Sequence, residues 1–130
     1  MATKREATFA LGFGMAALAV TGAKAGVEII VTEADALSAL NPWADALFSG
    51  DPAQVAQVLA PEYQILRFDG TGLDRASYLK ALPQQKKRSQ FSAITATAGA
   101  DIMVIRYMLD TDQVINGQIV QGVSPRLSVF

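Results

Sequence analysis

Residues 41–68 read NPWADALFSGDPAQVAQVLAPEYQILRF, and this stretch decides the fold. Apolar side chains recur at the spacing of one helical face, at Leu40, Trp43, Ala44, Leu47 and Phe48. Gly50 is typical of a helix C-terminus, and Asp51 followed by Pro52 is typical of the cap and first position of a new helix. The stretch therefore predicts two helices joined by a short hinge.

The segments on both sides extend this prediction. Thr32 and Asp35 resemble a capping box, so we expect the first helix from about Ala34 to Ser49, kinked at Pro42. Pro61 ends the second helix, and residues 63–68 have the composition of a strand.

The remainder alternates turns with apolar runs. After a turn at residues 69–72, Asp74 caps a short helix that ends before Pro83. Residues 91–98 and 102–109 predict strands. We place the next turn at Asp110–Asp112, and we interpret Asn116-Gly117 as an irregularity in the last strand. Ser124-Pro125 predicts a further bulge or bend.

Composition restricts the chemistry. The chain has 130 residues, 51% of them apolar, a formal net charge of −1, and neither Cys nor His. One domain with a substantial core is expected, and nothing in the charge favours nucleic acid as a partner. Without Cys or His, thiolate catalysis, Ser-His pairs and zinc sites built on these ligands are excluded, so we expect no metal and no cofactor.

The first 25 residues have the pattern of a secretory signal peptide. Lys4 and Arg5 are basic, residues 7–19 are apolar and uncharged, and Ala23-Lys24-Ala25 has the form of a cleavage site. The apolar run is short for a membrane span, which argues against a permanent anchor. We therefore expect residues 1–25 to be removed and residues 26–130 to form a secreted or periplasmic domain.

The order of these elements resembles the nuclear transport factor 2-like superfamily. The resemblance is carried by residues 43–51, 59–63, 74–79 and 125–130, and no single motif is diagnostic. It implies an α+β domain in which a cone-shaped, curved antiparallel sheet wraps around about three N-terminal helices. Members usually have a further strand after the segment that resembles residues 126–130, so we expect this domain to lack its last strand.

The resemblance also implies candidate catalytic residues, because ketosteroid isomerases of this superfamily use a carboxylate base and hydroxyl or carboxyl donors. Asp69, which follows the first strand, is the candidate base, and Tyr107 is the candidate hydrogen-bond donor. Asp101 and Tyr63 are weaker candidates. Each of these residues also has a structural interpretation, as a turn residue for the aspartates and as core packing for the tyrosines.

A ligand cavity is expected between the first helix and the inner face of the sheet. Its predicted walls are Trp43, Leu47, Tyr63, Ile65, Met103, Ile105 and Tyr107. Arg67 and Arg106 each lie within an apolar strand, where an unpaired charge is costly. Each is either a solvent-facing or subunit-facing residue with a carboxylate partner, or a clamp for a ligand carboxylate or phosphate.

Three functions follow from these patterns. The first is an exported binding or accessory domain for a small apolar molecule. The second is an isomerase, dehydratase or cyclase. The third is an interaction module that dimerises through the outer sheet face, where Val104, Arg106 and Met108 alternate, without ligand chemistry. A homodimer is expected in any of these cases.

Overall fold

The computed structural model describes residues 29–130. The chain divides into two units, and the fold lies in the unit formed by Val31–Ala98 and Ile102–Phe130, which we describe by itself. Its elements in chain order are α1 (Glu33–Ser49), α2 (Pro52–Val58), β2 (Gln64–Leu66), β3 (Gly72–Asp74), α3 (Arg75–Lys80), β4 (Gln84–Gln85), β5 (Gln90–Ala98), β6 (Met103–Ile115) and β7 (Gln118–Val129). The predicted α+β class is therefore confirmed, with three helices preceding the main antiparallel sheet.

Local capping explains where α1 begins. The Thr32 side chain accepts a hydrogen bond from the Asp35 backbone N–H at 3.2 Å, and the Asp35 carboxylate accepts one from the Thr32 N–H at 2.8 Å. This reciprocal pair is the capping box that the sequence predicts. Pro42 lies inside the helix, which continues through it to Ser49.

The hinge between α1 and α2 also follows the prediction. Gly50 ends α1 in the left-handed region with φ 70°, which is favourable for a residue without a Cβ. The Asp51 side chain accepts a hydrogen bond from the Ala53 backbone N–H at 2.9 Å, and Pro52 occupies the first helical position. The two helices are thus specified locally.

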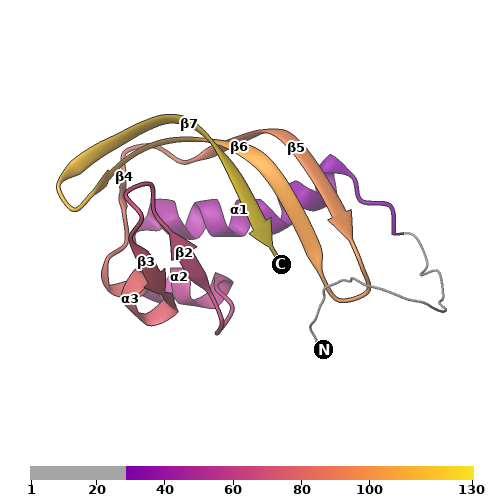
Figure 1. The fold of residues 1–130 in the computed structure, drawn as a ribbon, viewed down its shortest axis with the longest axis horizontal. Coiled ribbons are helices and arrows are strands. Elements are labelled where there is room, and N and C mark those ends of the chain that lie inside the picture. The colour runs from indigo at the N-terminus through magenta and orange to yellow at the C-terminus, as the bar shows by residue number, and fades with distance from the viewer. Residues whose placement is uncertain (1–28) are drawn as a thin grey trace. The chain divides into compact units, whose positions relative to one another are not determined.

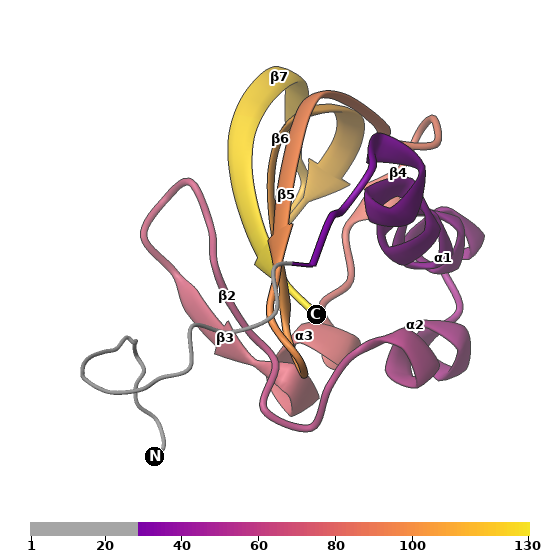
Figure 2. The ribbon, with the colours of Figure 1, turned by 90° about the vertical axis from the view of Figure 1, so that its right-hand side faces the viewer.

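The sheet is built around β6. Strand β7 pairs antiparallel with β6 from Val104↔Val129 to Ile115↔Gln118, while β5 and β4 pair with successive parts of β6. Because β7 covers β6 along nearly its whole length, β5 and β4 share the opposite edge. Strands β5, β6 and β7 run side by side over α1 (Figure 1). Figure 2 shows α1 and α2 together on one side of these strands.

The turn that we place at Asp110–Asp112 is wrong. Strand β6 continues to Ile115, and the hairpin turns at Asn116 and Gly117, whose φ angles are 51° and 79°. Two consecutive positive φ angles are the requirement of a type I′ turn, for which Asn-Gly is the favoured pair. The two aspartates instead lie within the strand, because its alternation of inner and outer side chains continues without interruption.

The predicted bulge at Ser124-Pro125 is also absent. Pro125 lies opposite Met108 without a shift of register, in a strand that has a neighbour on one side only. Such an edge strand tolerates proline where the missing N–H would not point at a partner. The irregularity lies in β5 instead, between Ser92 and Thr95, where Ala93 has φ 52°.

Strand β2 is shorter than predicted and forms a hairpin of its own. It pairs antiparallel with β3, a strand that the sequence did not predict, through Ile65↔Leu73 and its neighbours. The hairpin is not hydrogen-bonded to the sheet of β4–β7. It is closed by a hydrogen bond of 2.9 Å from the Arg67 N–H to the Thr71 carbonyl.

Two apolar clusters form the core. The first joins the N-terminal half of α1 to β6 and consists of Ala36, Leu40, Ile105, Tyr107 and Leu109. The second joins the C-terminal half of α1 to α2 and α3 and consists of Ala46, Leu47, Val55, Leu59 and Tyr78. Trp43 packs against both clusters. None of the helices within residues 29–130 has the length and apolar character needed to cross a membrane.

Candidate functional site

An open groove of about 1150 Å³ extends between the helices, β2 and the inner face of β6 and β7. We call it the central groove. Apolar and aromatic side chains form most of its walls: Trp43, Leu47, Leu59, Tyr63, Ile65, Tyr78, Leu109 and Val120, together with Tyr107. A concave, mainly apolar surface of this size is typical of a site for a small ligand.

Regular spacing brings these walls together. Trp43 and Leu47 lie four positions apart on α1, so their side chains lie on the same helical face. Tyr107 and Leu109 lie two positions apart on β6, so they lie on the same face of the sheet. Aromatic contacts brace this wall, because the Phe91 ring lies 6.3 Å from that of Trp43 and 5.4 Å from that of Tyr107, centroid to centroid.

Arg67 is the one buried cation among the described residues, with 8% of its surface exposed. It lines the central groove together with its neighbours Leu66 and Phe68, whose side chains are largely exposed. Its Nη2 donates a hydrogen bond of 2.7 Å to the Ala81 carbonyl, and its guanidinium carbon lies 5.9 Å from the centroid of the Tyr78 ring. No carboxylate within residues 29–130 forms a salt bridge with it.

A polar network forms another part of the groove wall. The Ser89 hydroxyl donates to Gln85 Oε1 at 3.1 Å, and Gln85 Nε2 donates to Gln113 Oε1 at 2.7 Å. Ser89, Thr111 and Gln113 are all buried. Thr111 and Gln113 lie two positions apart on β6 and share its inner face. All four residues line the groove. Thr111 and Gln113 do so because the inner face of β6 changes from apolar to polar after Leu109.

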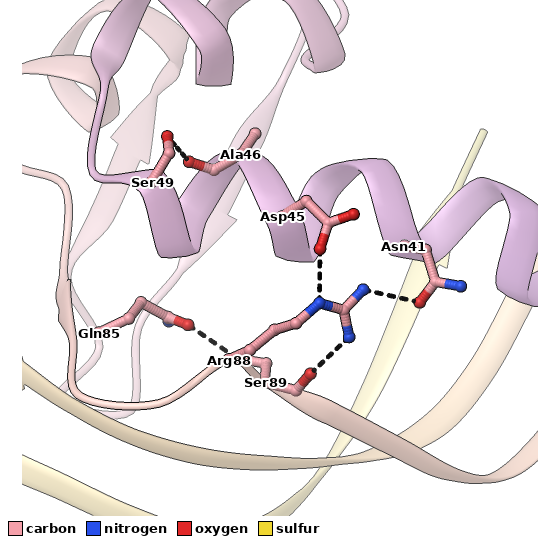
Figure 3. Close-up of polar contacts among 7 residues, drawn as sticks. All are labelled: Asn41, Asp45, Ala46, Ser49, Gln85, Arg88 and Ser89. Carbon is pink, nitrogen blue, oxygen red and sulfur yellow. Dashed lines mark hydrogen bonds and ion pairs between the residues drawn. The ribbon is translucent and has the colours of Figure 1, made fainter.

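The linker that supplies Gln85 and Ser89 is held against α1 by Arg88 (Figure 3). Its Nε donates to Asp45 Oδ1 at 2.5 Å, and its Nη2 donates to Asn41 Oδ1 at 3.0 Å. Asn41 and Asp45 lie one helical turn apart, so one planar guanidinium contacts both. The contact positions the polar wall and lies outside the groove itself.

The tyrosines of the groove keep their protons at neutral pH. Burial, together with the neighbouring Tyr78, raises the pKa of Tyr63 far above its ordinary value of 10.0. Burial also raises the pKa of Tyr78 to about 12 and that of Tyr107 above its ordinary value. The Tyr107 hydroxyl is 2.9 Å from Ser128 Oγ, with which it shares a hydrogen bond. These hydroxyls therefore offer hydrogen bonds and do not supply a phenolate base.

The predicted site residues divide into two groups. Six line the central groove: Trp43, Leu47, Tyr63, Ile65, Arg67 and Tyr107. The other predicted wall residues, Met103 and Ile105, pack in or against the first core cluster and do not line the groove, because they come too early in β6. Arg67 therefore lies in the wall of the groove. Strand β6 contributes to this wall from Tyr107 onward, later in the strand than Met103 and Ile105.

The acidic candidates lie elsewhere. Asp69 is exposed in the turn between β2 and β3, where its Oδ1 accepts a hydrogen bond from the Thr71 backbone N–H at 2.9 Å. This hydrogen bond lowers the pKa of Asp69 below 3.8, the opposite of what a base shielded in a cavity requires. Asp101 is exposed after β5, and Arg106 is exposed on the outer face of β6. None of these three lines the groove.

Sequence reasoning missed the polar part of the wall. Ser89, Thr111, Gln113 and Tyr78 were not candidates. For Thr111 and Gln113 the reason is the turn expected at Asp110–Asp112, which ended one strand at Leu109 and placed Gln113 in the next. The alternation Leu109, Thr111, Gln113 was present in the sequence and identifies them once β6 is continuous. Within residues 29–130 there is no cluster of three or more acidic side chains that could hold a metal ion.

Comparisons with solved structures identify the fold. An NTF2-like protein from Cytophaga hutchinsonii superposes with a TM-score of 0.67 at 12% identity, covering 76% of this chain and 85% of that one. A structure assigned to a calcium/calmodulin-dependent kinase II association domain from Exiguobacterium sibiricum superposes with a TM-score of 0.63 at 13% identity, covering 80% and 84%. The described domain therefore has the nuclear transport factor 2-like fold.

Sequence comparison adds nothing to this identification. No family model matches the chain, and no curated protein does. At 12–13% identity the structural likeness concerns the fold, and the fold hosts many unrelated functions.

Proposed function

We propose that this domain binds a small, largely apolar molecule in the central groove and acts as a binding or accessory domain. One observation carries the proposal: the groove has about 1150 Å³ of space and is bounded mainly by apolar and aromatic side chains. Covering such a surface with an apolar ligand removes it from water, which stabilises the complex in proportion to the area covered.

Binding is favoured over isomerase-type catalysis by the position of the carboxylates. Glu62 is the one acidic residue that lines the groove, and it is exposed, whereas Asp69 lies outside it with a lowered pKa. A general base needs a pKa near the working pH and access to the substrate. Neither condition is supported for Asp69, so the groove is better suited to holding a molecule than to abstracting its proton.

Trp43 makes the proposal directly testable. It is the single tryptophan of the chain and it lines the groove, so its fluorescence reports on an occupant. Titration with 1-decanol, a neutral apolar probe, should change this fluorescence with saturation at one molecule per chain. A fluorescence signal that only drifts linearly with decanol would refute the proposal.

A matched pair of variants locates the binding site. Val120 and Ile119 are adjacent on β7, but Val120 lines the groove, whereas Ile119 is 67% exposed and does not. Val120→Phe should fill the groove and weaken decanol binding by about tenfold or more, the scale of one or two kcal/mol of overpacking. Ile119→Phe should leave the affinity unchanged. Equal effects of the two substitutions would place the probe outside the groove.

We also propose that the domain forms a homodimer through the outer face of the sheet. Four large apolar side chains of β7 are more than half exposed on that face: Ile119, Val123, Leu127 and Val129. Exposed apolar side chains gathered along one strand are typical of an interaction surface. Three of these residues, Val123, Leu127 and Val129, also border the central groove, so the proposed interface and the groove share part of β7.

A further inference from the structure

The buried polar side chains of the described domain are concentrated at one place. Four polar or charged residues are less than 9% exposed, namely Arg67, Ser89, Thr111 and Gln113, and all four line the central groove. Burying a polar group is costly unless a hydrogen bond compensates for the lost water. Apolar side chains at these four positions would stabilise the fold at a lower cost. The buried polar groups are therefore best explained by contacts with a ligand in the groove.

Hydrogen bonding separates these four residues into two kinds. Ser89 and Gln113 are bridged by Gln85, which accepts a hydrogen bond from the Ser89 hydroxyl and donates one to Gln113 Oε1. Arg67 and Thr111 have fewer hydrogen-bond partners than their polar atoms could accommodate. The guanidinium of Arg67 makes a single hydrogen bond, to the Ala81 carbonyl, and the Thr111 hydroxyl makes none within residues 29–130. The Arg67 group has five N–H donors in a planar fork, so most of its hydrogen-bonding capacity remains unused.

We infer that the ligand of the central groove carries a carboxylate, which pairs with the guanidinium of Arg67 while the apolar body of the ligand lies along Trp43 and Leu47. The inference rests on the proposed binding function and specifies the chemical class of its ligand, a small amphipathic monocarboxylic acid. Its carrying observation is a buried cation that lines an apolar groove and has no carboxylate partner within residues 29–130.

A carboxylate matches this site better than other anions. A single guanidinium offers one positive charge and two parallel N–H groups, which fit the two oxygens of a carboxylate. A phosphate dianion would bring a second negative charge into the groove, where the remaining arginine, Arg126, is exposed to solvent and so offers a weaker partner than the buried Arg67. The contacts of Arg67 with Ala81 and Tyr78 hold its side chain in place before the ligand arrives, which lowers the ordering cost of binding.

The test compares two probes that differ only in the head group. Decanoate and 1-decanol have the same alkyl chain, and each is titrated into the wild-type protein with Trp43 fluorescence as the readout. Decanoate should bind at least about tenfold more tightly than decanol, the ratio expected for a charge-assisted hydrogen bond in a partly desolvated site. This comparison requires no substitution, so it does not depend on whether a variant folds.

Variants then assign the preference to a residue. Arg67→Met should bring the affinities for decanoate and decanol to within about twofold of each other, after circular dichroism has shown that the variant is folded. Arg106→Met, on the outer face of β6, is the control and should keep the full preference. Loss of the preference in Arg126→Met but not in Arg67→Met would overturn the assignment to Arg67.

The outcomes distinguish this inference from the proposed function. Saturable decanol binding with no tighter binding of decanoate would overturn the carboxylate inference and leave the apolar groove as a neutral binding site. Failure of both probes to bind would overturn the proposed function and the inference with it. Tighter binding of decanoate that depends on Arg67 supports both.

Discussion

Trp43 lies where the two core clusters meet, so one side chain joins the packing of α1 against the sheet to its packing against α2 and α3. The same side chain lines the central groove. Stability and binding are therefore coupled at this residue, and they can be separated only by measuring both.

Substitution of Trp43 tests the packing at the residue scale. Trp43→Ala should lower the free energy of unfolding by about 3 kcal/mol, because it removes a large side chain from two clusters and leaves a cavity. Phe48→Ala is the control on the same helix, since Phe48 is 50% exposed, and it should cost about 1 kcal/mol or less. Urea unfolding followed by circular dichroism measures both. Equal losses would mean that Trp43 is not part of the core.

Asp69 provides the opposite test at the same scale. Because it is exposed in the turn between β2 and β3 and does not line the groove, Asp69→Asn should leave decanol binding within about twofold. Absorbance of a conjugated enone, formed from a β,γ-unsaturated ketone, is the complementary measurement. Turnover by the wild-type protein that disappears in Asp69→Asn would restore the isomerase hypothesis.

At the scale of elements, short helices and their caps position the groove. Arg75, the first residue of α3, donates hydrogen bonds to the carbonyls of Ala56 and Leu59 at the end of α2, at 2.6 and 3.3 Å. Asp74 caps α3 by accepting a hydrogen bond from the Ser77 N–H at 2.8 Å. These contacts place Tyr78 of α3 in the second core cluster, where it lies under Arg67.

The cap at Asp74 predicts a dependence of stability on pH. Its hydrogen bond with the Ser77 backbone lowers the pKa of Asp74 below 3.8, so the charged form stabilises the folded state. This contribution is present above pH 3.8 and is lost as the pH falls through the lowered pKa. Asp74→Asn keeps a capping side chain without the charge.

The wild-type protein should accordingly be more stable than Asp74→Asn at pH 7, and the difference should shrink as the pH falls below 3.8. Thermal unfolding of both proteins across this range measures it. A difference that is the same at pH 7 and at pH 3 would exclude the charge of Asp74 as its cause.

Two proposals concern the whole molecule: a homodimer through the outer face of the sheet, and export with removal of a signal peptide. Substitution of Leu127, which is 67% exposed, tests the homodimer. Leu127→Glu should convert a dimer to a monomer, because it places a charge in an apolar interface. Light scattering coupled to size exclusion determines the mass. A wild-type monomer at micromolar concentration would refute the dimer.

We also propose that the protein is exported and cleaved after Ala25. The predicted signal peptide, residues 1–25, lies outside the described residues, so the proposal is supported by the sequence pattern alone. N-terminal sequencing of the protein recovered from the periplasm or medium should begin at Gly26. Recovery of the intact chain in the membrane fraction would contradict it.

The sequence by itself determined the helical part of the fold. Thr32, Gly50 and Asp51 specify where α1 and α2 begin or end, because caps and left-handed residues act on backbone groups a few positions away. The spacing of apolar residues identified the faces of α1 and of the segment around β2 that line the groove. The charge of Arg67 within that apolar segment also marked it as a candidate.

Tertiary structure alone decided the path of the sheet and the composition of the site. Two turn signals, at Asp110 and Asn116, competed for one hairpin, and pairing with β7 over the full length of β6 selected the second. That choice carried Thr111 and Gln113 into the groove and left Met103 and Ile105 with the core. The physical reason is that register depends on which partner strand buries a residue, and a strand's partner lies far away in the sequence.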